Sequence, residues 1–180
     1  AQALKPEKST NLSAGLTFNP TPTLRLAVDA YQIKVSDRLG VSSNIGIDRS
    51  SGVALDGSGR PFTAAQATVI ENLLRSAGLT VGNGLVAHYF ANVGDTRTRG
   101  IDFTAEDVLR VADGKLRWTA AANLNHTSLV DKAALPTVLQ GLPNIGTLSK
   151  SAEYDLLYRA PRDKEIVTLA YEKAGWTFNL

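Results

Sequence analysis

The segment Tyr89–Ala105, which reads YFANVGDTRTRGIDFTA, decides the fold class of this 180-residue chain. In its second half, the apolar residues Ile101, Phe103 and Ala105 alternate with polar ones. Successive side chains of a β-strand point to opposite faces, so this alternation predicts a strand with one apolar and one polar face. We expect that strand to run from about residue 90 to residue 108.

The same two-residue period recurs along the chain and predicts further strands of one antiparallel sheet. Pro20, Pro22, Gly114 and Gly175 favour tight turns between neighbouring strands. The connections are then alternately short and long, which is typical of up-and-down β-barrels with one functional rim. The further strands are predicted at about 9–19, from 24 to a long loop that begins near 40, at 116–129, at 164–172, and from 176 onward.

The strand that begins at Leu24 contains a change of phase. Leu26 and Val28 lie on one predicted face, whereas Tyr31 and Ile33 lie on the other. Such a change indicates either a β-bulge or a strand that leaves the membrane and continues as an extracellular extension. Both interpretations stay open at this point.

Two long connections, at about 40–88 and 130–162, lack the strand pattern. In the first, Thr63 and Gln66 form a capping box ahead of apolar residues at helical spacing, which predicts a short amphipathic helix from Ala64 to Ala77. In the second, we expect the chain to be extended again over residues 153–158 before Pro161.

Composition narrows the possible functions. The chain has 19 basic and 17 acidic residues and no cysteine. It therefore lacks the charge excess of a nucleic-acid-binding protein and cannot form a disulfide or thiolate site. No stretch approaches the roughly 20 apolar residues of a membrane helix, but a spanning β-strand needs only about 9–11 residues. Since the chain begins without Met or a leader and ends inside an alternating run, we expect it to be a fragment of a longer protein.

No motif supports catalysis, a metal or a cofactor, so we expect no enzyme activity. The segment Gly82–Ala87 has the form of a dinucleotide fingerprint but precedes a β-segment instead of a helix. The segment Asp56–Gly59 lacks the later carboxylate of a calcium loop, so it predicts a turn. His88 and His126 do not occur at a metal-ligand spacing.

The segment NVGDTRTRGIDF, residues 92–103, resembles the part of TonB-dependent outer-membrane receptors that leads from a long extracellular loop back into the barrel. Residues Leu4–Leu39 resemble that family's descending strand, Pro-rich periplasmic turn and ascending strand. The resemblance implies an all-β fold of antiparallel up-and-down strands forming part of a transmembrane β-barrel, with one short helix in a long extracellular loop. Residues 1–180 would be a fragment of one barrel domain, with the plug domain and the terminal strands outside it.

The resemblance also implies a function. The protein would reside in the bacterial outer membrane, in contact with its lipid. There it would bind a scarce small molecule, such as an iron chelate of the ferric siderophore type, and import it with energy from a TonB-type protein. Two alternatives remain: a soluble β-sandwich that serves as a binding or structural module, and a passive porin-type barrel.

Two sets of residues are candidates for specific roles. The residues that would contact a ligand at the loop bases are His88, Tyr89, Arg97 and Arg99. Arg97 and Arg99, with Asp95, could act electrostatically at the rim or lumen wall, or simply pair with neighbouring strands. The aromatic residues expected at the membrane–water interface, where rings with a polar edge are favoured, are Phe18, Trp118, Tyr171 and Trp176.

Overall fold

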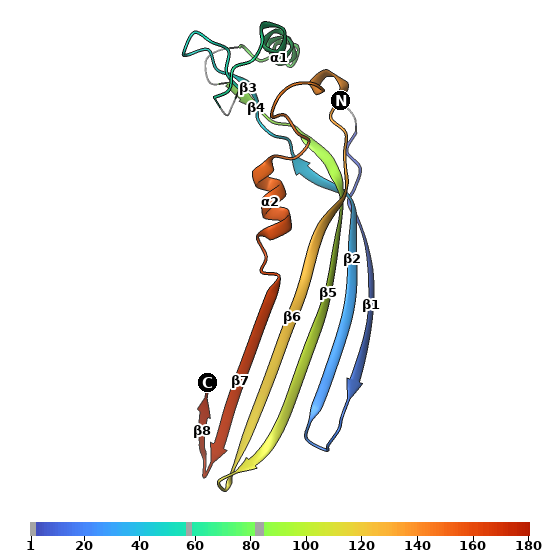
Figure 1. The fold of residues 1–180 in the computed structure, drawn as a ribbon, viewed down its shortest axis with the longest axis vertical. Helices are drawn as coiled ribbons and strands as arrows, with labels where there is room; N and C mark the ends of the chain where they lie inside the picture. Colours follow the sequence, from blue (N-terminus) through green and yellow to red (C-terminus); the bar gives the residue numbers. More distant parts are fainter. Residues whose placement is uncertain (1–2, 57–58, 82–84) are drawn as a thin grey trace. The chain divides into compact units, whose positions relative to one another are not determined.

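A computed structural model describes residues 3–56, 59–81 and 85–180. Six strands form one sheet in the order β1-β2-β5-β6-β7-β8, so each pairs with the next sheet strand along the chain (Figure 1). A separate two-stranded sheet joins β3 and β4. The strands are β1 (Lys8–Phe18), β2 (Arg25–Val41), β3 (Ile45–Ile47), β4 (Leu85–Ala87), β5 (Phe90–Val111), β6 (Gly114–Lys132), β7 (Asp163–Lys173) and β8 (Trp176–Asn179).

The chain divides into two compact units. The sheet unit comprises Ser9–Val35, Thr96–Ser128 and Leu156–Leu180. The loop unit comprises Ala1–Lys8, Ser36–Asp95 and Leu129–Asp155.

Two-residue turns hold the register of the sheet unit. Ala112 and Asp113 both have positive φ, as do Ala174 and Gly175. Two such residues form the type I′ turn that matches the twist of a β-hairpin. The register of the β7–β8 hairpin places Tyr171 opposite Phe178. β6 and β7, which are joined by the second long connection, pair with Trp118 opposite Leu169. The turns predicted at these two positions are therefore confirmed.

The apolar face of the sheet unit is not a dry core. Leu16 is 73% exposed and Phe103 is 40% exposed, and Leu169 is exposed as well. A soluble sandwich would bury these side chains beneath a second sheet. The described residues do not bury them, so the structure gives no support to the sandwich alternative. The predicted all-β, up-and-down antiparallel architecture is confirmed as an open six-stranded sheet.

No β-bulge lies at the change of phase in β2. Arg25 pairs with Glu106 of β5 at 3.8 Å, and Gln32 accepts a hydrogen bond from Arg99 Nε at 2.8 Å. Because both strands advance by the same number of residues between these pairs, no extra residue is inserted near Tyr31. The polar residues that follow Tyr31 therefore continue on the same face as Leu26 and Val28.

The loop unit has a small hydrophobic core of its own. The predicted helix is present as α1 (Ala64–Ser76), with the capping box between Thr63 and Gln66. Its buried face packs against β3 and against residues of the second long connection. The core consists of Ile45, Ile47, Ala54, Phe62, Ala67, Ile70, Leu74 and Leu139.

The second long connection differs from its prediction. Residues 153–158 were expected to be extended, but they belong to a second helix, α2 (Lys150–Tyr158). Ser149 explains the difference, because its Oγ accepts the Ala152 N–H at 3.1 Å and its carbonyl accepts the Glu153 N–H at 2.9 Å. This capping starts a helix that the apolar pattern did not reveal. The expectation of a single short helix was therefore wrong, and a 3₁₀ turn, η1 (Thr137–Leu139), was missed as well.

None of the described helices is long and apolar enough to cross a bilayer.

A substitution at Leu139 would test whether the two long connections share one hydrophobic core. Leu139 is 2% exposed within that core, whereas its neighbour Val138 is 51% exposed. In the full-length protein, Leu139→Ala should destabilise the loop unit by about 2–5 kcal/mol, because it opens a cavity. Hydrogen exchange of the α1 amides would report this change. Val138→Ala is the matched control and should shift α1 protection by less than about 0.5 kcal/mol; equal effects of the two variants would contradict a shared core.

Candidate functional site

The polar face of the sheet unit carries a hydrogen-bonded cluster drawn from three strands. Asn123 of β6 donates from Nδ2 to Tyr31 Oη of β2 at 3.1 Å and to Asp102 Oδ1 of β5. Asn125 Nδ2 donates to Asn123 Oδ1 at 2.7 Å. Neutral amides therefore link a phenol to a carboxylate across three strands.

Gly100 makes room for this cluster. A Cβ at Gly100 would overlap Cζ and Oη of Tyr31, so the aromatic ring lies directly on the backbone of β5. A glycine inside a strand often marks a close approach of another group to the backbone, and the structure shows such an approach at Gly100. The polar cluster itself was missed. The hairpin turn at Ala112–Asp113 was the signal that could have placed Asp102 beside Asn123.

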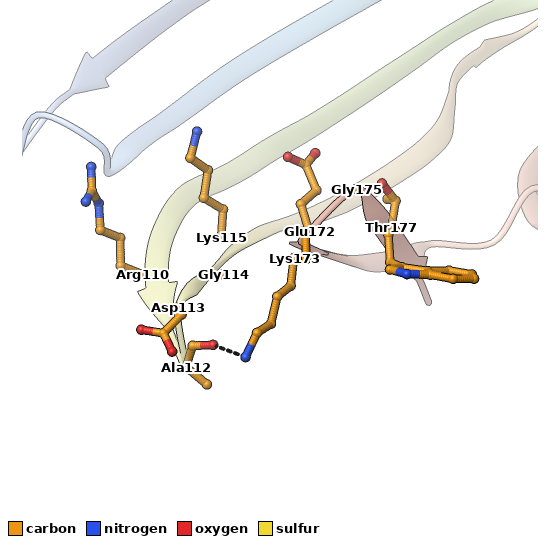
Figure 2. A pocket seen from close by; sticks show the side chains of 11 residues that line it. Arg110, Ala112, Asp113, Gly114, Lys115, Glu172, Lys173, Gly175 and Thr177 are labelled. Carbon is orange, nitrogen blue, oxygen red and sulfur yellow. Dashed lines mark hydrogen bonds between the residues drawn. The ribbon is translucent and has the colours of Figure 1, made fainter.

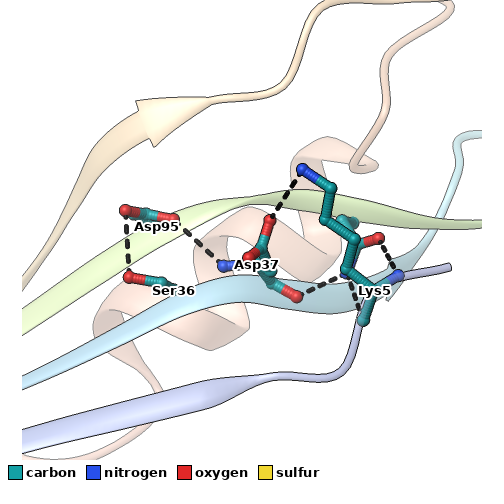
Figure 3. A network of polar contacts seen from close by, with 5 residues as sticks. Lys5, Ser36, Asp37 and Asp95 are labelled. Atoms are coloured by element: carbon teal, nitrogen blue, oxygen red, sulfur yellow. Dashed lines mark hydrogen bonds and ion pairs between the residues drawn. The ribbon is translucent and has the colours of Figure 1, made fainter.

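A polar network fixes the backbone of the loop unit where β2 is irregular (Figure 3). Asp37 adopts a left-handed conformation with φ of 54°, and its N–H donates to Asp95 Oδ1 at 3.1 Å. Ser36 Oγ donates to the other oxygen of Asp95 at 3.2 Å. Lys5 Nζ lies 3.8 Å from Asp37 Oδ1, and Asn92 Nδ2 donates to the Asp37 carbonyl at 2.6 Å. Three chain segments are thereby held at one point.

Ser42 contacts two of the candidate ligand residues, His88 and Tyr89. Its Oγ accepts the Tyr89 N–H at 3.1 Å, and its carbonyl oxygen lies 3.3 Å from His88 Nδ1. Burial raises the pKa of the Tyr89 hydroxyl. That hydroxyl is buried and has no hydrogen-bond partner among the described residues. Tyr89 packs against the core of the loop unit, so its ring serves packing; a role in ligand contact stays a prediction.

Arg97 and Arg99 belong to the sheet unit. Arg99 is exposed and donates from Nε to Gln32, while the Arg97 carbonyl accepts from Ser128 Oγ at 3.3 Å. Arg97 Nε is buried and unbonded among the described residues. Neither arginine forms a salt bridge in the part of the chain that the structure describes. Arg99 does contact the neighbouring strand β2 through Gln32, and an electrostatic role of the two arginines stays a prediction.

Elsewhere in the loop unit, charged side chains form contacts that fix the segment after β3. Arg49 contacts Glu71 of α1, with Nη2 and Oε1 2.6 Å apart. The pKa of Asp48 is lowered, since the Ser50 N–H and hydroxyl stabilise its carboxylate. These contacts hold the segment after β3 beside the helix.

A concavity of about 780 Å³ lies between the short turns of β5–β6 and β7–β8 (Figure 2). Its charged lining combines both signs, with Arg110, Lys115 and Lys173 on one hand and Asp113 and Glu172 on the other. Lys173 Nζ donates to the Ala112 carbonyl at 2.8 Å, which ties the two turns together. Because its lining carries charges of both signs and the concavity is open, it shows no preference for a particular ligand.

The predicted interface aromatics occupy the sheet near its short turns. Phe18 and Trp176 are exposed, Trp118 and Tyr171 are partly buried, and Tyr171 Oη donates to the Val111 carbonyl at 3.1 Å. Their role at a membrane interface stays a prediction. No cluster of three or more potential metal ligands occurs within the described residues. Gly57, Ser58 and residues 82–84, parts of the turn and of the fingerprint-like segment considered above, lie outside them.

Comparison with known proteins gives one result. A family model described as TonB dependent receptor-like, beta-barrel, matches residues 1–179. No curated protein and no solved structure gives a significant match.

Gly100→Ala should displace Tyr31 and destabilise the sheet by about 1–3 kcal/mol, because the added methyl group overlaps the ring. Denaturant or thermal unfolding of the full-length protein would measure the change. Adding Tyr31→Ala should remove most of the penalty of the glycine substitution. Additive effects of the two substitutions would contradict the close approach.

Tyr89→Phe should leave the stability of the loop unit unchanged or raise it by up to about 1 kcal/mol, because it removes a buried hydroxyl that has no partner. Hydrogen exchange of the Ser42 and Tyr89 amides would measure this. Tyr171→Phe is the matched control: its hydroxyl bonds to the backbone of the neighbouring turn, so its loss should cost about 1 kcal/mol locally. A destabilised Tyr89→Phe would show that the hydroxyl has a bonding partner.

Proposed function

Because this chain belongs to the family of TonB-dependent receptor-like β-barrels, we propose that it is part of an outer-membrane receptor that imports a scarce small molecule. The ligand is an iron chelate of the ferric siderophore type or a compound of similar size. Import draws its energy from a TonB-type partner and involves no chemistry by this chain. The membership implies outer-membrane transport; the ligand, the energy coupling and the partner are parts of the proposal.

The two-faced sheet is the observation that carries this proposal. On β5 the face that includes Ile101 and Phe103 continues to Val111. Ten residues of strand span roughly 33 Å, or about 23 Å along the normal at a tilt near 45°, close to the apolar band of about 25 Å of outer-membrane barrels. One carboxylate, Asp107, interrupts this face, and its Oδ1 accepts the neighbouring Val108 N–H at 2.7 Å.

The opposite face suits a hydrated lumen. It presents Tyr31, Asp102 and Asn123 in one hydrogen-bonded cluster, with the ion pair of Arg25 and Glu106 on the same face. Such groups would be costly in hydrocarbon but are well solvated beside water. The assignment of lipid to one face and water to the other follows from this contrast.

The loop unit supports a role in ligand capture. Long loops of outer-membrane barrels lie on the extracellular side, and the short turns face the periplasm. The two long connections here share one hydrophobic core, so they form a fixed surface in place of independent flexible strands. A preorganised surface loses less conformational entropy when it binds a ligand.

Uptake of iron-55 chelates tests the proposal in cells that carry or lack the full-length protein. Ferric hydroxamates and ferric catecholates are the first probes. Accumulation should require the receptor, the TonB-type protein and an energised inner membrane. Uptake that persists without the TonB-type protein or with a protonophore would favour the passive porin alternative. Failure of every chelate, while the protein resides in the outer membrane, would reject the ligand class.

A pair of variants separates capture from assembly. Ile70 is fully buried in the core of the loop unit, whereas its neighbour Val69 is exposed. Ile70→Asp should abolish ligand uptake, because a buried unpaired charge disrupts the loop core, yet the barrel should still assemble. Val69→Asp places the same charge on the surface of α1 and should preserve uptake. Normal uptake by Ile70→Asp would show that the loop unit is not needed for capture.

A further inference from the structure

We propose that the outward face of the sheet unit has a phosphate-binding site for anionic lipid headgroups, built around Arg97 and Arg99 where β5 passes out of the apolar band. The inference rests on the proposed function, because that function assigns the exposed apolar face to lipid. It concerns a different contact from ligand import, namely one between the receptor wall and the surrounding leaflet.

The two arginines lie on the apolar face and not on the lumen face. Arg99 and Ile101 alternate on the same side of β5. Arg99 is bonded to Gln32, which shares its side of β2 with Val28. The lumen side at this level holds Gly100 and the Tyr31 ring. The outward face of β2 therefore changes from apolar residues such as Val28 to polar residues such as Gln32, without a change of side. In the proposed membrane setting, this is the point where the strand leaves the hydrocarbon and enters a polar layer.

Distance along the strand places Arg99 at headgroup depth. Ile101 is exposed and is the apolar residue nearest to Arg99 on this face of β5 within the sheet unit. Arg99 lies two residues before Ile101 in the sequence. This separation is about 7 Å along the strand and about 5 Å along the membrane normal at a tilt near 45°. The polar headgroup region of each leaflet is roughly 5–7 Å thick. Arg97 lies about 13 Å along the strand from Ile101, at the outer edge of that layer.

Among the described residues, the nearest carboxylate along this side of β5 is that of Asp95, two residues before Arg97, and it accepts hydrogen bonds from the Ser36 hydroxyl and the Asp37 N–H. Arg97 and Arg99 form no salt bridges within the described part of the chain, and Gln32 is neutral but holds the guanidinium of Arg99 in place. A guanidinium has five donors in a planar fork, which suits a phosphate group. Lipid phosphates are the anions present at this depth, which identifies the partner.

Two further acidic residues of the same face lie on another strand. Glu165 of β7 is opposite Ala122, and Asp163 is opposite Leu124, so both are two strands away from Arg99. The outward face is thus basic at the Arg97–Arg99 end of β5, whereas its carboxylates lie on β7 and, at Asp107, eight residues from Arg99 along β5. An anionic headgroup is therefore expected to settle over β2 and β5, where it avoids the carboxylates.

Lipid binding to the full-length receptor in neutral detergent micelles would test this inference. Native mass spectrometry measures the apparent affinity for dioleoylphosphatidylglycerol, with dioleoylphosphatidylcholine as the zwitterionic reference. Each cation near an anionic headgroup contributes about a fivefold increase in affinity. Arg97→Gln with Arg99→Gln should therefore weaken phosphatidylglycerol binding about 25-fold and leave phosphatidylcholine unchanged.

Arg25→Gln is the matched control, because Arg25 lies on β2 but on the lumen face, paired with Glu106. It should leave both lipid affinities unchanged. An equal loss in the control and the double variant would overturn the site, as would equal affinity of the unaltered receptor for both lipids. Inorganic phosphate that binds as tightly as the lipid would overturn the headgroup assignment. Failure of the proposed function would look different, since a protein that is not an outer-membrane barrel would be absent from the outer-membrane fraction.

Discussion

The backbone ladder between neighbouring strands is the constraint on which this structure depends. In hydrocarbon no water is available to bond an open N–H or carbonyl group, so each strand has to satisfy its backbone through its neighbours. Once the ladder forms, every side chain is assigned to one of two faces, and a slip of one residue would exchange them. The two-residue turns at Ala112–Asp113 and Ala174–Gly175 prevent that slip within the β5–β6 and β7–β8 hairpins.

The two faces of the sheet differ in how their side chains are stabilised. On the polar face, Asn123 bonds to both Tyr31 and Asp102, so polar groups are satisfied by each other across three strands. On the other side, residues such as Leu16 and Phe103 remain exposed within the described structure. Exposure of this kind would favour aggregation in water but is the stable arrangement against lipid chains. The same sheet is therefore suited to a boundary between two solvents.

Much of this sheet could be predicted from the sequence, because a two-residue period and strong turn residues are local signals. The helix after Thr63 was also predictable, since its capping box and apolar spacing lie within a few residues of each other. The helix after Ser149 was not, because its apolar residues show no clear helical face and its start depends on one hydroxyl. β3 and β4 are three residues each and too short for any period to be visible. The contacts of His88 and Tyr89 could not be predicted, because both residues contact Ser42, which is 46 positions from His88 along the chain.

The shared core of the two long connections has a consequence for evolution and for engineering. Leu139 is embedded among residues of the first connection, and Gly146 donates its N–H to Ser43 Oγ at 2.6 Å. If only one of these segments is transferred into another receptor, it loses the residues of the other segment that complete its hydrophobic core. Chimeras with new selectivity should therefore exchange both segments as one cassette, and natural variation in either segment should be matched by compensating change in its companion.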